Sequence, residues 1–216
     1  MLVGGLDPSA SESRASGVAV LDLGSRRLLR AEALLSDAEI VGALRGVAVL
    51  AVDSPLSEPR GGAMRAVDRE MIRRGFRVLP PSWRPMSQLT RRALALVREI
   101  GSPAIETHPR SALRSSGCGD VGELLDAMGI SHGELPRSRD ALDAVVAAAV
   151  AAEAVEGRAL EVRAEDGSIY LCPRECTRGS AWRTPGLSGP STLLTRGPWG
   201  PWPRPWSRWR APCSRP

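Results

Sequence analysis

Five acidic side chains stand where an apolar segment ends or a helix begins, and these positions suit chemistry. Asp7 ends a short apolar segment in VGGLDPS, and Asp53 ends another in VAVLAVDSPLSEP. Glu106 lies in the apolar segment of AIETHP, and Asp140 and Asp143 share the first turn of the helix predicted by RDALDAVVAAA. Because neighbouring strand ends meet at one edge of a parallel or mixed sheet, we expect these acids to converge.

Converging carboxylates indicate a divalent cation. Like charges repel and burial disfavours the ionised form, so such a cluster needs a neutralising partner. Carboxylate oxygens are hard ligands, which favours Mg²⁺ or Mn²⁺ over Zn²⁺. Two such ions about 4 Å apart activate a water and stabilise the leaving oxygen in phosphodiester cleavage. We therefore predict Asp7, Asp53, Asp143 and Asp140 as metal ligands, and Asp7, Asp53, Asp143 and Glu106 as catalytic residues.

Each acid also has an ordinary structural interpretation. Asp7 and Asp53 both precede proline-containing turns and could simply form those turns. Asp140 could cap its helix, and Asp143 could complement the helix dipole. Glu106 could be a buried acid paired with an arginine. The recurrence of acids at strand and helix ends favours a site over these separate roles.

Three other side chains are candidates for binding a phosphate substrate. Arg65 and Arg69 lie four residues apart, and their guanidinium groups could clamp a phosphate. We favour the alternative, a solvated helix face with an ion pair to Asp68. His108 lies two positions beyond the acid of AIETHP and could be a general acid or base, although a structural histidine in a turn fits equally well. Trp83 could stack on a base, but packing over the core is the favoured interpretation.

The hydrophobic pattern predicts a strand meander followed by alternating helices and strands. Strands are expected at residues 2–6, 17–23, 28–34, 47–52 and 103–107, helices at 37–44, 64–74, 86–100 and 140–156, short helices near 111 and 121, and a hairpin at 160–171. A meander followed by crossover units implies a mixed sheet covered by helices. The predicted fold class is therefore α/β, an RNase H-like mixed five-stranded sheet flanked by helices.

Charge separates the chain into two parts, a domain at residues 1–172 and a Pro/Arg/Trp-rich tail at 173–216. The chain has a formal charge of +5, but residues 174–216 hold eight arginines and one acid, so residues 1–173 carry −2. The domain is therefore not a uniformly basic surface for nucleic acid. The tail has no helical or strand period and is expected to be disordered. Its Trp and Arg residues could alternatively stack on bases or lie at a membrane interface, and a gene read out of frame would give the same composition.

The cysteines and the N-terminus predict a cytoplasmic protein. Cys172 and Cys176 have the spacing of a zinc half-site, but no second pair follows, so we interpret them, with Cys118 and Cys213, as free thiols. The chain starts without a basic segment followed by an apolar one, and no apolar run approaches the roughly 18 residues of a membrane span. Cytoplasmic localisation and no membrane partner are therefore expected.

Several motifs resemble known families. GLDPS with SGVAVLD is similar to the first hairpin of RuvC-type Holliday-junction resolvases, and DALDAVVAAAV resembles their last helix. Residues 1–172 as a whole resemble the domain-of-unknown-function 429 family of predicted RNase H-like nucleases. The matching stretches are GLDPS, AVDSPLSEP, RAVDREMIRRG, VLPPSW, IETHPRSAL, DALDAVVAA and DGSIYLCP. The resemblance implies Asp7, Asp53 and Asp143 as core metal ligands, with Glu106 or Asp140 as a fourth. The second acid of the resolvases is Glu, whereas this chain has Asp53.

Three functions from different classes follow. The first is a metal-dependent nuclease that hydrolyses phosphodiester bonds by a two-metal carboxylate mechanism on DNA or RNA. The second is an RNase H-like nucleotide-binding phosphotransferase, although DPSASES is Ser-rich where such enzymes need glycines under the phosphates. The third is a non-catalytic module that binds nucleic acid or protein. We predict the nuclease.

Overall fold

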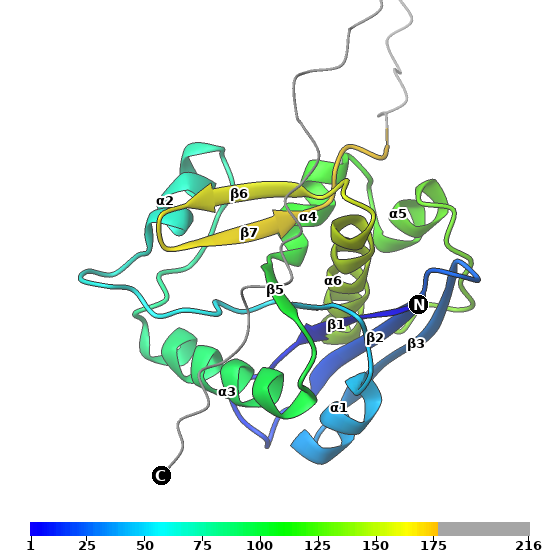
Figure 1. The fold of residues 1–216 in the computed structure, drawn as a ribbon, viewed down its shortest axis with the longest axis horizontal. Helices are drawn as coiled ribbons and strands as arrows, with labels where there is room; N and C mark the ends of the chain where they lie inside the picture. The colour runs from blue at the N-terminus through cyan, green and yellow to red at the C-terminus, as the bar shows by residue number, and fades with distance from the viewer. Residues whose placement is uncertain (177–216) are drawn as a thin grey trace, which may run out of the picture. The chain divides into compact units, whose positions relative to one another are not determined.

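The computed structural model describes residues 1–176 (Figure 1). Its elements follow the predicted order closely. They are β1 (Leu2–Asp7), β2 (Ser16–Asp22), β3 (Arg27–Leu34), α1 (Asp37–Leu44), β4 (Leu50–Val52), α2 (Ala66–Arg73), α3 (Arg84–Ile100), β5 (Ala104–Thr107), α4 (Pro109–Ser116), α5 (Val121–Ala127), α6 (Arg139–Val155), β6 (Leu160–Ala164) and β7 (Gly167–Leu171).

One mixed sheet organises these elements, in the order β3-β2-β1-β4-β5-β7-β6. The first three strands form the predicted antiparallel meander, and β1, β4, β5 and β7 run parallel to one another. The predicted α/β class and mixed sheet are confirmed, with seven strands in place of five. The difference arises because the predicted hairpin does not stand apart: β7 pairs with β5 through Glu106–Ile169 and Thr107–Tyr170, and β6 extends the edge.

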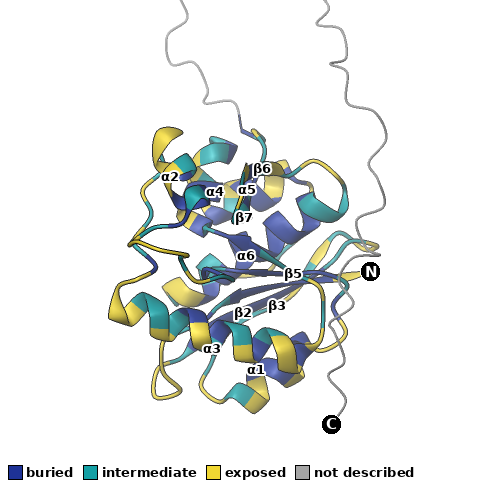
Figure 2. Cartoon of the chain, turned by 60° about the vertical axis from the view of Figure 1, so that its left-hand side comes forward, coloured by how far each residue is buried: buried dark blue, intermediate teal, exposed yellow. Residues whose placement is uncertain are grey.

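Helices cover both faces of the sheet (Figure 2). On one face α1 and α3 pack over apolar side chains of β1, β2 and β4, including Leu6, Val18 and Leu50. On the other face α6 lies across β1 and β2, flanked by α4 and α5. From Ala144 to Ala152 helix α6 contains only alanine and valine, so this stretch is narrow and apolar all round, and all of its residues are buried. A helix of this kind belongs inside a layered core rather than on its surface.

Local sequence signals set the helix ends. Ser36 and Glu39 form a capping box at the start of α1. Ser138 caps α6 by accepting a hydrogen bond from the backbone of Ala141, so the capping interpretation of Asp140 is wrong. Trp83 precedes α3 with 55% of its surface exposed, which contradicts the predicted packing over the core.

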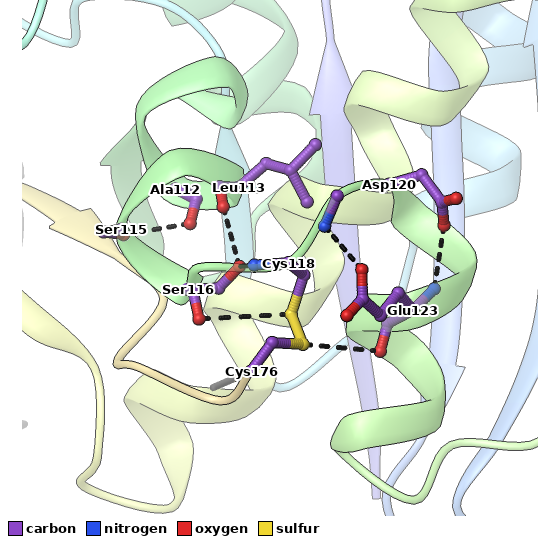
Figure 3. The surroundings of a disulfide bond; sticks show 9 residues. Ala112, Leu113, Ser115, Ser116, Cys118, Asp120, Glu123 and Cys176 are labelled. Atoms are coloured by element: carbon purple, nitrogen blue, oxygen red, sulfur yellow. Dashed lines mark hydrogen bonds between the residues drawn. A yellow bond between two sulfur atoms is a disulfide. The ribbon is translucent and has the colours of Figure 1, made fainter. Parts of the chain in front are cut away.

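A disulfide joins Cys118, just after α4, to Cys176 (Figure 3). The expectation of free thiols is therefore wrong for these two residues, and the zinc half-site of Cys172 and Cys176 is excluded. Cys172 remains a buried free thiol whose pKa burial raises. The backbone amide of Cys176 also donates to the carbonyl of Ser116 at 3.0 Å, so the chain after β7 lies along the end of α4.

The predicted tail falls mostly outside the described residues, as does Cys213, because the structure describes the chain only as far as residue 176. Within residues 1–176 no helix is both long enough and apolar enough to span a membrane.

Candidate metal centre

The carboxylates of Asp7, Asp53 and Asp143 lie together, and one oxygen from each is within 4.8 Å of the others. Two of them come from neighbouring parallel strands, since Leu6 of β1 pairs with Val52 of β4. The amide of Asp53 donates to the carbonyl of Leu6 at 2.8 Å, which continues this register by one residue. Parallel strands thus bring two acids to one sheet edge, as the strand pattern predicts.

The third acid reaches this edge because α6 passes unusually close to the sheet. Gly5 in β1 and Gly17 in β2 lie beneath it without side chains. A Cβ on Gly5 would overlap the backbone oxygen of Ala144, and one on Gly17 would overlap that of Asp140. The two glycines therefore let the first turns of α6 rest on the sheet, which carries Asp143 to the strand ends.

All three carboxyl groups are held in surroundings that disfavour their charge. Burial, and then the charges of Asp143 and Asp140, raise the pKa of Asp7. Burial, and then the charges of Asp7 and Asp143, raise the pKa of Asp53 well above its ordinary value. Burial also raises the pKa of Asp143. A bound cation would reverse this cost, because it favours the ionised form of every ligand.

Two arginines lie near the cluster without cancelling its charge. Arg139 contacts Asp143 at 3.6 Å from one turn away, but its side chain is 65% exposed. An exposed helical pair of this kind contributes only about 0.3–0.5 kcal/mol. Arg110 in α4 lowers the pKa values of Asp53 and Asp143 through its charge. The pKa values of both carboxyl groups nevertheless stay raised.

Glu106 is engaged elsewhere, although its strand ends at the same edge. Both of its oxygens accept hydrogen bonds from the guanidinium of Arg65, at 2.7 and 2.5 Å, and one also accepts from the amide of Leu56 at 2.9 Å. Arg65 donates in addition to both oxygens of Asp68. This buried network matches the alternative of an arginine-paired acid, and it leaves Glu106 outside the three-carboxylate group.

The structure does not support Arg65 as part of the candidate phosphate clamp. Arg65 is only 2% exposed and is occupied by its two acids, so it cannot reach a substrate phosphate. The ion pair with Asp68 is present, but it is buried rather than on a solvated face. Arg69 is exposed and donates to the carbonyl of Met64 at 2.8 Å.

Neither His108 nor Asp140 belongs to the three-carboxylate cluster. His108 caps α4, since its Nδ1 accepts from the amide of Ser111 at 3.3 Å and lies 2.8 Å from the hydroxyl of the same residue. Burial, and then the charge of Arg110, lower the pKa of His108. A neutral ring with Nδ1 as acceptor carries its proton on Nε2. Asp140 lines a pocket together with Asp7.

Sequence reasoning missed the basic residues around the centre. Arg110 follows His108 by two residues at the start of α4, directly after the strand bearing Glu106. That position, next to a strand end on the acidic edge, was the available signal. Arg14 gave no signal, because it lies in the turn between β1 and β2 and reaches the site region only through the fold.

No family model matches the chain, and no curated protein matches it. Among solved structures it is similar to RuvC from Thermus thermophilus in two forms. The complex with a Holliday junction substrate is 20% identical with a TM-score of 0.42, and a second RuvC structure is 19% identical with a TM-score of 0.43. Each comparison covers 73% of this chain and 98% of the other.

Proposed function

We propose that this protein is a divalent-metal-dependent nuclease that hydrolyses phosphodiester bonds. The observation that supports the proposal is the group of Asp7, Asp53 and Asp143. One oxygen from each lies within 4.8 Å of the others, and the pKa values of all three are raised. Hard oxygen ligands of this kind fit Mg²⁺ or Mn²⁺. The resemblance to the domain-of-unknown-function 429 family agrees with this proposal.

The side chains have distinct tasks in such a reaction. The three carboxylates would hold the metal, which when bound supplies Lewis acidity and a water of lowered pKa. Asp7 and Asp53 would also accept hydrogen bonds from the attacking water and so orient it. Arg110 and Arg139 place positive charge beside the acids, where it would offset the charge of a phosphate.

His108 has the properties of a hydrogen-bond donor to the substrate. Its Nδ1 is occupied by Ser111, and within residues 1–176 its Nε2 has no hydrogen-bond partner, so this nitrogen would donate to a phosphate oxygen. Glu106 and Arg65 would stabilise the position of the strand end, because their hydrogen bonds hold the end of β5 against α2 and the loop before it. We assign Glu106 this positioning role in place of the predicted catalytic one.

Replacement of the shared ligands tests the proposal. Asp7→Asn, Asp53→Asn and Asp143→Asn should each reduce Mg²⁺- or Mn²⁺-dependent cleavage by at least about 100-fold, since each removes a charge that holds the metal. Purified full-length protein is assayed on single-stranded, duplex and four-way-junction DNA and on the corresponding RNAs. Asp126→Asn is the matched control, because Asp126 is exposed on α5 and is not part of the three-carboxylate group.

Cleavage by the site variants is compared with cleavage by the control. Cleavage that Asp126→Asn retains and the three site variants lose supports the nuclease. Cleavage by Asp7→Asn at the rate of the parent contradicts it. Calorimetric titration with Mn²⁺ gives a second measure, since binding should be lost in the same three variants and retained in the control.

A further inference from the structure

A small pocket opens beside the acidic cluster and shares Asp7 with it. Its volume is about 230 Å³, and it lies between the turn that follows β1 and the first turns of α3. Pro85, Met86 and Leu89 of α3 form an apolar wall, while Arg14 and Asp140 contribute charged groups. Whatever fills this pocket therefore lies directly against a proposed metal ligand.

The pocket wall is held in place by an arginine of α3. Arg92 donates to the carbonyl oxygen and the hydroxyl of Ser9, at 2.8 and 2.6 Å, and to the hydroxyl of Ser16 at 3.1 Å. It also pairs with Asp37 at 2.5 Å. These bonds tie the turn between β1 and β2 to α3, so the two sides of the pocket are fixed relative to each other.

The charged groups of the pocket are available to a ligand. Within residues 1–176 neither the guanidinium of Arg14 nor the carboxylate of Asp140 has a hydrogen bond or ion pair with a protein side chain or backbone group. Arg14 is exposed, so an incoming phosphate can reach it. The pocket thus offers an apolar face, a cation and an acceptor within one small volume.

We propose that this pocket receives the nucleoside of one unpaired nucleotide beside the scissile phosphate. The inference rests on the proposed function and specifies its substrate. The volume is below the roughly 300–1,000 Å³ of pockets for drug-sized ligands, which suits a single base with its sugar. The apolar wall meets the face of the base, and Arg14 binds the phosphate on the far side of that nucleotide.

A consequence for substrate choice follows from the pocket's position. A base inside a regular duplex is stacked and paired, and it can enter the pocket only by leaving the stack, which costs free energy. In single strands, mismatches and branch points the base is already unpaired, so this free-energy cost is smaller. The enzyme should therefore prefer nucleic acid that is unpaired at the cleavage position over a continuous duplex.

Filling the pocket tests the inference. Leu89→Trp places a ring where the base should lie, and Arg14→Gln removes the phosphate contact at an exposed position that cannot disturb the core. Leu29→Trp is the matched control, since Leu29 is exposed on the edge strand β3. Binding of a fluorescein-labelled single-stranded DNA and of the RNA of the same sequence is followed by anisotropy in Ca²⁺, and cleavage is followed in Mg²⁺.

We expect Leu89→Trp to weaken single-strand binding by about tenfold or more and Arg14→Gln by about three- to tenfold, with the control unchanged. Mn²⁺ affinity should remain that of the parent in all three. The parent should also prefer a duplex carrying one mismatch to the fully paired duplex, and Leu89→Trp should lose this preference. The DNA and RNA arms identify which sugar the pocket accepts.

The outcomes separate this inference from the proposed function. If both pocket variants lose binding but the parent cleaves nothing, the pocket assignment stands and the nuclease fails. If the parent cleaves and both variants bind and cleave as it does, the pocket assignment fails and the nuclease stands. If the parent binds neither strand, the pocket assignment fails, and the nuclease is judged by the cleavage assay alone.

Discussion

At the scale of the residue, the metal-free centre brings together three carboxyl groups whose ionised forms are disfavoured. Asp7, Asp53 and Asp143 each have a raised pKa, and burial is the first cause in every case. A carboxyl group with a higher pKa in the folded state than in the unfolded state favours folding at low pH. That contribution is lost as pH rises from the ordinary carboxyl pKa near 4 through the raised pKa.

Removing one of these charges should therefore stabilise the metal-free protein. Asp7→Asn is expected to raise the free energy of unfolding in EDTA at pH 8 by about 1 kcal/mol or more, and by less at pH 5, where the parent carboxyls are partly protonated. Urea unfolding at both pH values measures the difference. An equal effect at pH 5 and pH 8 would show that repulsion is not its cause. Saturating Mn²⁺ should reverse the order, because it stabilises only the parent.

Glu106 should behave as a structural residue. Glu106→Gln leaves the buried guanidinium of Arg65 with one acid in place of two, and breaking such a pair costs about 3–5 kcal/mol. Chemical denaturation measures this loss. Glu58→Gln is the control, since the Glu58 pair with Arg91 is exposed and should matter little. Mn²⁺ affinity of the folded variant should stay near that of the parent, whereas a true metal ligand would lose it.

At the scale of the element, the close approach of α6 to the sheet decides whether the centre exists. Gly17→Ala should push the start of α6 away from β2, lower stability by about 1–3 kcal/mol and weaken Mn²⁺ binding by displacing Asp143. Gly42→Ala is the matched control, because nothing lies within 4 Å of a Cβ at that position of α1. The control should be neutral or slightly stabilising. Unchanged Mn²⁺ affinity in Gly17→Ala would contradict this account.

The sequence predicts these elements well because their periods are strong. Apolar runs ending at Asp7 and Asp53, and the Ala-rich stretch after Asp140, are each sufficient to identify a strand end or a helix start. The partners of individual side chains are not predictable in this way. Glu106 turns toward Arg65, 41 residues earlier, and β7 pairs with β5, because of contacts that only the folded chain creates.

At the scale of the whole molecule, charge is distributed locally rather than by net sign. Residues 1–173 carry −2, yet Arg14, Arg110 and Arg139 all lie around the acidic centre. A substrate would therefore be guided by a few cations at the site and not by a broad basic surface. The composition excluded the broad surface, whereas the local group depends on residues far apart in the sequence.

The disulfide acts at the same scale, since it joins residues 58 positions apart. Its reduction, or the double replacement Cys118→Ser with Cys176→Ser, should lower the free energy of unfolding by about 2–4 kcal/mol. Urea unfolding with and without reductant measures the loss. Cys172→Ala serves as the control for thiol chemistry, because it leaves the bond intact, and a parent that reductant leaves unchanged would contradict the assigned bond.

The same bond closes a covalent ring of backbone that runs from α5 through α6 to the end of β7. Asp143 lies on the ring, whereas Asp7 and Asp53 lie on the linear segment before it. A protease cut in the connection between α5 and α6 would therefore open the ring without freeing a fragment. Asp143 on one fragment and Asp7 and Asp53 on the other would stay covalently linked until a reductant broke the disulfide.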